Sequence, residues 1–371
     1  MNRSVGPSVV FGPEIWNLQQ QGGVSRYAKE LINNIAVLNN SVKAVIPDTN
    51  NVYAQEISSK VKITANQFEN FLNEPNFDGL FNGNKTLYHA TYFSEVGISA
   101  MKRMGVQTVV TVHDMISELF PERPPLFRRK NRVKQKTIQM ADHIVCVSQN
   151  SANDLERIYG VSQEKISITY PGTSFGDFTK QIDNDTLRLT PFLMYVGNRD
   201  KYKNFKRLIM ALSSSKLFMS NFKLVAFGGG SFSKLEITFL KEFGMWEHVI
   251  HVEGNDTKLF DYYSCAKSLI YPSIYEGFGS PPIEAMASGC PTIVSSGGSI
   301  PEVCGEAAIY FDPYNLQNIR NVIDETIQND TLLSDLSNIG KMHSLKYSWE
   351  NTAIATLKAY DKLTSSGIEK E

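Results

Sequence analysis

Short apolar runs rich in β-branched residues alternate along the chain with longer segments of helical periodicity. The runs fall into two series, 8–12, 42–47, 86–91, 107–114, 143–148 and 166–172, then 191–197, 222–230, 248–254, 268–273, 291–296 and 307–312. Helical segments such as 24–38 and 151–159 follow several of these runs. This alternation is typical of strand–helix units that build parallel sheets. The sequence therefore predicts an α/β protein with one doubly wound sheet in each half of the chain.

A polar stretch separates the two series. Residues 174–190 follow the turn signal Pro171-Gly172 and have little apolar periodicity, so we predict a linker there. The last segment, 347–363, has apolar residues three and four positions apart, which predicts a helix with one buried stripe. Ligands of open α/β sheets bind beyond the carboxyl ends of the strands. With two sheets that face each other, the expected site is the cleft between them.

Composition and charge exclude several classes of protein. In 371 residues, 42% are hydrophobic and 20% are charged, which excludes a disordered chain. The 37 Lys and Arg residues balance 38 Asp and Glu residues, so no overall field favours nucleic acid. The four cysteines are scattered without paired spacing, which argues against a zinc module or a disulfide scaffold. With no leader-like start and no run of about 18 apolar residues, we expect a cytoplasmic protein.

The segment YEGFGSPPIEAMASG, 275–289, is the densest local signal. Pro281 and Pro282 suit a first helical turn and Ser280 suits an N-cap, so we expect a short helix from about 281 to Gly289. Loop amides that precede the positive end of a helix can bind phosphate. The sequence therefore predicts an anion site at the start of this helix.

Residues on both sides of that helix start suit a sugar–phosphate ligand. Gly277, Phe278 and Gly279 form the loop whose backbone can approach a ligand closely. Glu276 and Glu284 offer carboxylates that accept hydrogen bonds from sugar hydroxyls. In the alternative interpretation, Glu284 is only a favourable acid in the first turn and the glycines only form a turn.

This motif resembles the signature of retaining GT-B glycosyltransferases of family 4, in which two glutamates are separated by seven residues. The resemblance covers most of the chain, through LQQQGGVSRYAKELI (18–32), TVHDM (111–115), VCVSQNSANDL (145–155), YVGNRDKYKNFKRLI (195–209), the stretch 272–295 and the last, tryptophan-containing helix. It implies two Rossmann-like domains that face each other across a cleft. These are an acceptor domain over 1–173, to which a C-terminal helix at 349–371 crosses back, and a donor domain over 191–348 after the 174–190 linker.

The resemblance also assigns residues to roles. It implies that Glu276 binds hydroxyls of the transferred sugar, that Glu284 binds the ribose, and that backbone amides around Phe278 to Ser280 hold the phosphates, with Gly277 also among the donor-binding residues. Arg199 and Lys203 follow the strand at 192–196 and stabilise the departing diphosphate; a solvated basic loop is the alternative.

Three residues of the first half complete the set. His113 lies near the transferred sugar in the family, and a hydrogen-bonded histidine at the end of a sheet is the alternative. Gly22 and Gly23 approach the donor diphosphate in the family, although such a pair often only forms a turn. The residues expected to be catalytic are Glu276, Arg199, Lys203 and His113. We expect no metal ion and no cofactor besides the nucleotide-sugar donor.

The expected reaction is therefore the retaining transfer of mannose from GDP-mannose to a glycan or lipid-linked saccharide, in the synthesis of surface polysaccharide such as lipopolysaccharide. The resemblance implies a front-face displacement, in which the departing phosphate takes the proton of the acceptor hydroxyl. A transferase that uses a UDP-sugar is one alternative. The others are a sugar-nucleotide 2-epimerase of the same fold and a non-catalytic binder of nucleotide sugars.

A basic stretch, 123–136, lies in the expected acceptor domain. The segment 121–136 holds seven Arg and Lys residues against one acid, Glu122. Two interpretations stay open, a solvated helix face and a peripheral contact with the anionic inner face of the cell membrane.

Overall fold

The computed structural model describes residues 7–65, 81, 86–120, 124–179, 191–199 and 201–366. The chain divides into two compact units. Unit 1 comprises Met1–Gly172 and Trp349–Glu371, and unit 2 comprises Thr173–Ser348. Across the described residues, no helix combines the length and the apolar character that a membrane span requires.

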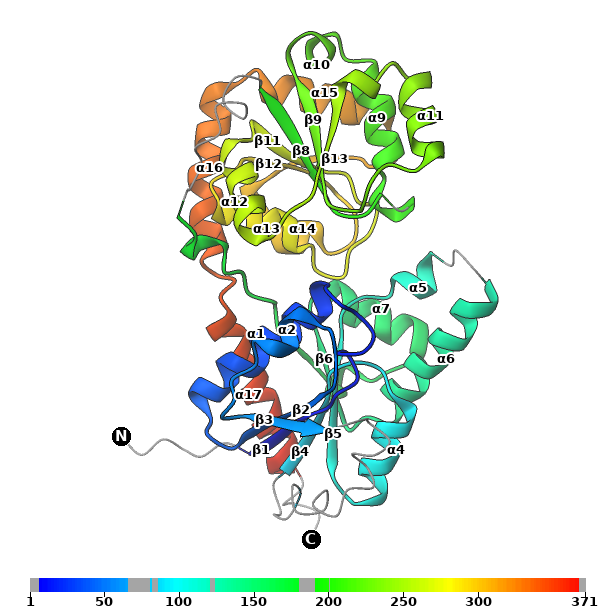
Figure 1. The fold of residues 1–371 in the computed structure, drawn as a ribbon, viewed down its shortest axis with the longest axis vertical. Coiled ribbons are helices and arrows are strands. Elements are labelled where there is room, and N and C mark those ends of the chain that lie inside the picture. Colours follow the sequence, from blue (N-terminus) through cyan, green and yellow to red (C-terminus); the bar gives the residue numbers. More distant parts are fainter. Residues whose placement is uncertain are drawn as a thin grey trace. The chain divides into compact units, whose positions relative to one another are not determined.

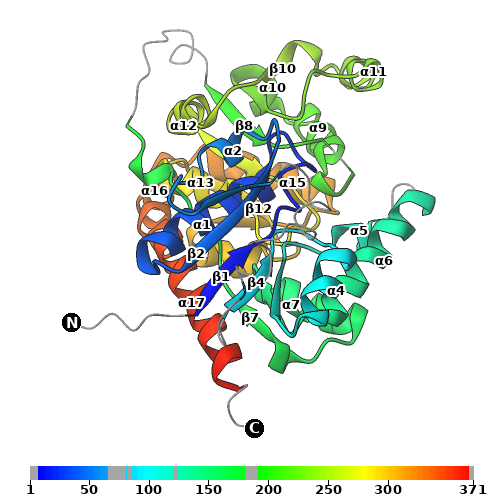
Figure 2. The ribbon, with the colours of Figure 1, turned by 60° about the horizontal axis from the view of Figure 1, so that its bottom comes forward.

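Unit 1 is built on a seven-stranded parallel sheet with the order β3-β2-β1-β4-β5-β6-β7. The strands are β1 Ser8–Phe11, β2 Val42–Pro47, β3 Lys62–Ala65, β4 Thr86–Ala90, β5 Gln107–Val112, β6 His143–Cys146 and β7 Ile166–Ile168. The helices include α1 Gly23–Leu38, α2 Val52–Gln55, α4 Glu95–Arg103, α5 Ile116–Leu119, α6 Pro124–Met140, α7 Gln149–Tyr159 and α17 Trp349–Ser366. Figures 1 and 2 show α4, α6 and α7 on one face of this sheet and α1 on the other.

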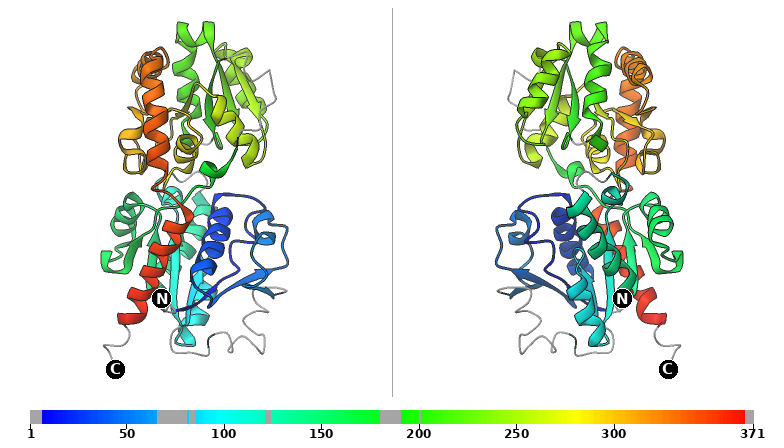
Figure 3. Two further views of the ribbon diagram at one scale, coloured as in Figure 1. Left: turned by 90° about the vertical axis from the view of Figure 1, so that its left-hand side faces the viewer. Right: turned by 90° about the vertical axis from the view of Figure 1, so that its right-hand side faces the viewer.

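The last helix belongs to unit 1, where α17 packs along α1 (Figure 3). The hydroxyl of Tyr360 forms a hydrogen bond with Nδ1 of His89, and Nε2 of His89 lies 2.9 Å from Oγ1 of Thr111. Both Tyr360 and His89 are buried. The final helix is therefore anchored to the sheet by a polar contact as well as by its apolar stripe.

Unit 2 has a six-stranded parallel sheet with the order β10-β9-β8-β11-β12-β13. The strands are β8 Phe192–Val196, β9 Lys223–Phe227, β10 Val249–Val252, β11 Ser268–Tyr271, β12 Thr292–Ser295 and β13 Ile309–Phe311. The helices include α9 Phe205–Ser213, α10 Lys216–Asn221, α11 Lys234–Glu242, α12 Asp256–Cys265, α13 Ser280–Ala287, α14 Ile300–Cys304, α15 Leu316–Ile327 and α16 Asp330–Ser344. One buried apolar cluster joins this sheet to α9, α10, α11 and α15.

Each sheet has one point at which the strand order reverses. In unit 1 it lies between β1 and β4, and in unit 2 between β8 and β11. The loops that follow such a pair of strands lead to opposite faces of the sheet and leave a crevice at its carboxyl edge, where ligands of this architecture bind. The two doubly wound parallel sheets predicted from the sequence are thus confirmed, each with one reversal point.

Several details differ from the sequence predictions. Strand β3 was not expected, and β7 covers only the start of the expected run at 166–172. Within the expected linker, Phe175–Asp177 forms a 3₁₀ helix, and the fully buried ring of Phe175 packs 5.9 Å from that of Tyr263 in unit 2. Residues 180–190 lie outside the described residues. The start of the predicted linker is therefore part of the core of unit 2.

Candidate active site

The carboxyl edge of the unit 2 sheet has an ion pair between two of the predicted site residues. Lys203 ends a 3₁₀ helix, Lys201–Lys203, in the loop after β8, and Glu276 lies in the loop after β11. Lys203 Nζ donates to Glu276 Oε1 at 2.8 Å and to the hydroxyl of Tyr271 at 3.2 Å. The Lys203 and Glu276 side chains are only 14% and 8% exposed. The two adjacent loops at the reversal point thus bring a cation and a carboxylate together.

Backbone contacts hold the two loops in register. The amide of Ile274 donates to the carbonyl of Tyr202 at 2.7 Å, which joins the loop after β11 to the loop after β8. The hydroxyl of Ser299 lies 3.0 Å from the carbonyl of Glu276 and 2.9 Å from that of Phe278. These contacts fix the segment that leads from Glu276 into α13.

Helix α13 begins one residue earlier than the sequence predicted. Gly279 is its N-cap, with a φ of 94°, and Ser280 is the first helical residue. No side-chain hydrogen bond caps this end of the helix. The predicted N-cap role of Ser280 is therefore wrong, because the left-handed backbone that starts the helix falls on the glycine. Pro281 and Pro282 carry no N–H, so the amide of Ser280 is the donor that the start of the helix offers to an anion.

The second glutamate of the motif lies further along α13. The sequence predicted Glu284 in the first turn of the helix. Because the helix starts at Ser280, Glu284 lies in the second turn instead. Its side chain is buried. Its place in the second turn differs from the alternative interpretation, in which Glu284 is only a favourable acid in the first turn.

Arg199 has partners other than the predicted phosphate. Its Nε donates to Glu236 Oε1 at 2.6 Å, and its two terminal nitrogens donate to backbone carbonyls of the loop that follows β9. The guanidinium also stacks 4.6 Å from the ring of Phe232. Burial raises the pKa of Glu236, but hydrogen bonds from Arg199 and Ser233 outweigh that effect and leave the pKa below its usual value. Arg199 thus holds this loop against the loop after β8.

The loop that Arg199 holds has a special backbone. Gly228, Gly229 and Gly230 all have positive φ, at 80°, 76° and 72°. Three successive left-handed residues direct their carbonyls in a similar direction, here toward the guanidinium. At Gly229 a Cβ atom would lie 2.8 Å from Nη1 of Arg199, so a side chain there is excluded.

The other predicted residues, His113, Gly22 and Gly23, lie in unit 1. His113 follows β5 and its ring makes an edge contact with Tyr27 at 4.9 Å. Burial, and then the charge of Lys134, lowers the pKa of His113 to about 4, so the imidazole is neutral near pH 7. Gly22 is extended and Gly23 starts α1, in whose first turn the amide of Ser25 donates a hydrogen bond to Gln19 Oε1 at 3.3 Å.

The sequence of the chain matches two family models that together cover most of it. Residues 21–175 match the model described as Glycosyltransferase Family 4, and residues 180–343 match that of Glycosyl transferases group 1. The chain is a family 4 glycosyltransferase of the GT-B type.

Relatives and solved structures agree with this assignment. The glycosyltransferase is 28% identical to O-antigen chain mannosyltransferase B of Escherichia coli over 69% of this chain and 71% of that protein. It is 26% identical to the serotype-specific mannosyltransferase WbdA of Escherichia coli over 71% of this chain. That match spans only 34% of the longer relative. A sucrose-phosphate synthase from Thermosynechococcus elongatus has the same fold, with a TM-score of 0.74 and 19% identity over 96% of this chain and 99% of that one.

Some residues that shape the site of this glycosyltransferase were not found from the sequence. Ser299 supports the loop carbonyls, and the glycines before it pack tightly, because a Cβ on Gly297 would lie 2.2 Å from the carbonyl oxygen of Ile274. The segment GGSIPE, 297–302, repeats the order glycine, serine, proline, glutamate of the main motif, and this repetition was the available signal. Tyr271 and Glu236 lie in an ordinary strand and helix and gave no signal.

Proposed function

We propose that this chain transfers a sugar from a nucleotide-diphosphate donor to a glycan or a lipid-linked saccharide, with retention of anomeric configuration. The observation that carries the proposal is the buried pair of Lys203 and Glu276 beside the start of α13, at the reversal point of a Rossmann-type sheet. GDP-mannose is the favoured donor and mannose the favoured transferred sugar, because the relatives named above are mannosyltransferases. The favoured pathway is the synthesis of surface polysaccharide.

The pair supplies both charges that such a donor requires. The bond between the anomeric carbon and the phosphate oxygen breaks, and negative charge grows on the departing diphosphate. A fixed ammonium such as Lys203 stabilises that charge more in the transition state than in the ground state. Glu276 accepts hydrogen bonds from sugar hydroxyls, and the Ser280 amide adds a donor for the phosphate. Glu284 is assigned to the ribose.

The hydrogen bond between the side chains of Lys203 and Glu276 does not use all the donors of the ammonium. Lys203 has three N–H donors, of which Glu276 and Tyr271 accept two. The third can reach a phosphate without loss of the pair. The bond that forms joins the acceptor oxygen to the anomeric carbon, and the proton of that hydroxyl passes to the departing phosphate.

Arg199, His113, Gly22 and Gly23 have weaker support. The partners of Arg199 within unit 2 suit a residue that positions the 228–231 loop. The neutral imidazole of His113 suits a hydrogen bond to a sugar hydroxyl. Contacts of His113, Gly22 and Gly23 with the donor stay predictions from the family resemblance, and so does independence from metal ions.

The test is turnover with and without a saccharide acceptor. GDP-mannose and UDP-glucose are each incubated with the chain, and release of nucleoside diphosphate is followed with and without methyl mannoside or a lipid-linked mannoside. A transferase releases GDP in proportion to the acceptor added, whereas a 2-epimerase changes the nucleotide sugar without one and a binder does neither. Proton NMR of the product reports the anomeric configuration.

A matched pair of variants ties turnover to the site. Glu276→Gln removes the carboxylate that we assign to the sugar, whereas Glu253→Gln makes the same change at an exposed residue of unit 2. We expect the first to lower turnover by about 10²-fold or more and the second to leave it unchanged. Equal activity of the two variants would remove the site from the proposal.

A further inference from the structure

Lys134 of α6 anchors the loop that begins with His113. This loop follows β5 and leads into α5. The ammonium of Lys134 donates to the carbonyl of Asp114 in the loop at 2.7 Å and to Glu118 Oε2 in α5 at 2.9 Å. The side chains of Lys134 and Glu118 are each only 6% exposed. A buried ion pair therefore joins both the loop and α5 to α6.

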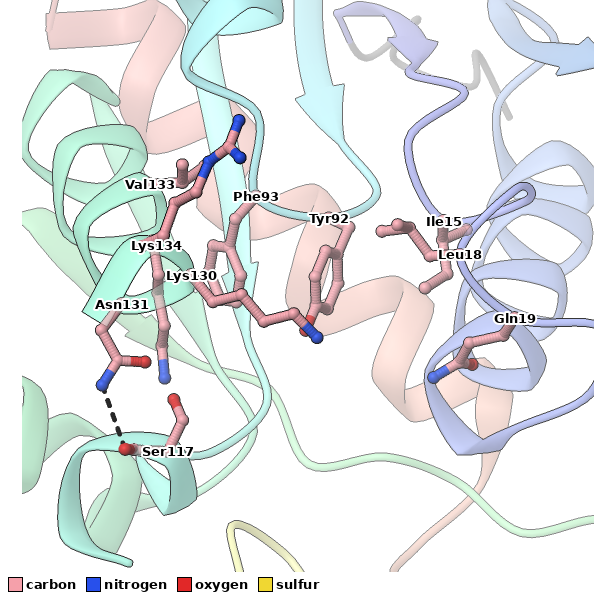
Figure 4. Close-up of a pocket in the computed structure, with 11 residues that line it drawn as sticks. Ile15, Leu18, Gln19, Tyr92, Phe93, Ser117, Lys130, Asn131, Val133 and Lys134 are labelled. Atoms are coloured by element: carbon pink, nitrogen blue, oxygen red, sulfur yellow. Dashed lines mark hydrogen bonds between the residues drawn. The ribbon is translucent and has the colours of Figure 1, made fainter. Parts of the chain in front are cut away.

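The bonding capacity of Lys134 is taken up within unit 1. An ammonium has three N–H donors, and Asp114 and Glu118 accept two of them. Its nitrogen also lies 5.4 Å from the centre of the Phe93 ring, a distance at which a cation is attracted to an aromatic face. Figure 4 shows Lys134 and Phe93 next to each other at the side of a cavity in unit 1. Lys134 therefore suits a residue that holds other groups in place, and not a cation that binds a ligand.

The carboxylate of Glu118 is fixed by contacts within three helices. Lys134 of α6 and the hydroxyl of Ser117 in α5 both donate to Oε2, the hydroxyl at 3.0 Å. The hydroxyl of Tyr159 at the end of α7 donates to Oε1 at 2.6 Å. The side-chain amide of Asn131 in α6 donates to the carbonyl of Ser117 at 3.0 Å, the contact drawn as a dashed line in Figure 4. Because both oxygens of Glu118 have partners, the packing of α5, α6 and α7 determines where the ammonium of Lys134 lies.

The charge of Lys134 also acts on His113. Burial, and after it this charge, lowers the pKa of His113 to about 4. The other polar groups around the imidazole come from different elements. The ring of Tyr27 in α1 makes an edge contact at 4.9 Å, His89 of β4 has a pKa of about 3, chiefly through burial, and Asp114 is the next residue of the loop. Lys134 is thus the cation that disfavours the imidazolium, and the neutral ring keeps one nitrogen free of a proton.

We propose that Lys134, fixed by Glu118, is a positioning residue for the transfer reaction. It sets the place and the neutral state of His113 and touches neither the donor nor the acceptor. This inference rests on the proposed function, in which the neutral imidazole forms a hydrogen bond with a sugar hydroxyl. An imidazolium has no acceptor nitrogen, so it could not accept the proton of that hydroxyl. One lysine of the basic stretch 123–136 thereby has a role that needs no membrane.

The first test compares two lysines of the same helix. Lys134→Met removes the buried ammonium, and Lys136→Met makes the same change two positions further along α6. The pair of Lys136 with Glu95 is 41% and 39% exposed, and exposed pairs contribute little to stability. We expect Lys134→Met to lower kcat about ten-fold or more and to change KM for the nucleotide sugar less than about three-fold, because a misplaced group acts on the reaction more than on donor binding. Lys136→Met should leave both parameters unchanged.

A double variant separates the positioning role from a contribution to stability alone. Lys134→Met leaves the Glu118 carboxylate buried without its cation, which destabilises the fold. Lys134→Met/Glu118→Gln replaces that carboxylate by a neutral amide, so its melting temperature should return toward that of the wild type. We expect kcat to stay as low as in the single variant, because the contact with Asp114 and the charge near His113 are still missing.

The charge of His113 gives a readout that does not depend on turnover. NMR titration of the full chain with labelled histidines follows each of the six rings, and His113→Gln identifies the His113 signal. The wild-type signal should remain that of a neutral ring down to about pH 5. Both variants without Lys134 should raise the pKa of His113 by about 0.5 or more, since no nearby cation disfavours the imidazolium, and Lys136→Met should not. The acid limb of kcat/KM should move to higher pH by the same amount.

Two results would overturn the inference. One is a His113 pKa that is the same in Lys134→Met and Lys136→Met, and the other is a double variant that recovers kcat together with its melting temperature. Failure of the proposed function gives a different result, because the wild type then transfers no sugar although the His113 titration still separates the two lysine variants. Conversely, sugar transfer that is indifferent to Lys134→Met leaves the function intact and removes the positioning role.

Discussion

Replacement of Lys203 by methionine tests the buried ion pair. The change keeps the length of the side chain but leaves the Glu276 carboxylate, 8% exposed, without its cation. Removal of one partner of a buried pair costs about 3–5 kcal/mol, because the remaining charge stays desolvated. Loss of the hydrogen bond to Tyr271 adds about 1 kcal/mol. For a unit of this size, the summed loss of about 4–6 kcal/mol lowers the melting temperature by roughly 8–24 °C.

The assay is scanning calorimetry of the full chain, with hydrogen–deuterium exchange to assign the early transition to unit 2. Lys201→Met is the matched control, since Lys201 is exposed on the same 3₁₀ helix. The double variant Lys203→Met/Glu276→Gln should recover most of the stability, because a neutral amide replaces the isolated charge. It should not recover turnover, which needs both residues. Lys203→Met as stable as Lys201→Met, or a double variant no better than the single one, would refute the reasoning.

Three further predictions follow from other contacts. Arg199→Met should accelerate amide exchange in residues 228–232 at least ten-fold, because the guanidinium holds that loop. The same variant should change kcat less than three-fold. A large loss of kcat with unchanged amide exchange would assign Arg199 to the reaction itself. Gly279→Ala should cost about 1–3 kcal/mol in thermal unfolding, since φ is 94°, and an unchanged melting temperature would contradict the backbone argument. Burial, and after it the charges of His113 and His143, lowers the pKa of His89 to about 3 from 6.5, so the unfolded chain binds the proton first. Stability should therefore fall as pH decreases from 6.5 toward 3, by up to about 1.4 kcal/mol per pH unit for this group, and urea unfolding of His89→Gln should show a weaker dependence.

The sequence predicted the sheets well because burial on both faces leaves a continuous apolar run. Runs such as 107–114 and 268–273 therefore coincide with β5 and β11. The short strand β3 was not predicted because KITA has few apolar residues and lies at the edge of the sheet, where it pairs with β2. In α17, Thr352 and Thr356 are buried whereas Ile354 is 37% exposed. The hydroxyl of Thr352 donates to the carbonyl of Tyr170, and that of Thr356 donates to the carbonyl of Thr352. A pattern of apolar positions does not reveal polar residues that are buried with such partners.

The candidate site was predictable in part. Lys203 and Glu276 were found because both follow strand ends within recognisable motifs, and the structure places them 2.8 Å apart. The partner of Arg199 was not predictable, since Glu236 lies 37 positions away on another helix. A cavity of about 600 Å³ in unit 1 was missed for the same reason, although the segments 18–32 and 123–136, which supply part of its lining, had been singled out. Its walls come from separate loops, and only the fold brings Gln19, Tyr92 and Lys130 together.

The most direct test of the central claim is hydrogen–deuterium exchange of the chain with saturating GDP or UDP. If a nucleotide diphosphate binds beside the pair of Lys203 and Glu276, amides in 197–204 and 273–284 should exchange more slowly, and those of α10, which lies in the connection that leads to the start of β9, should not change. Lys203→Met should abolish this protection. Protection elsewhere, with both loops unchanged at saturation, would contradict the account.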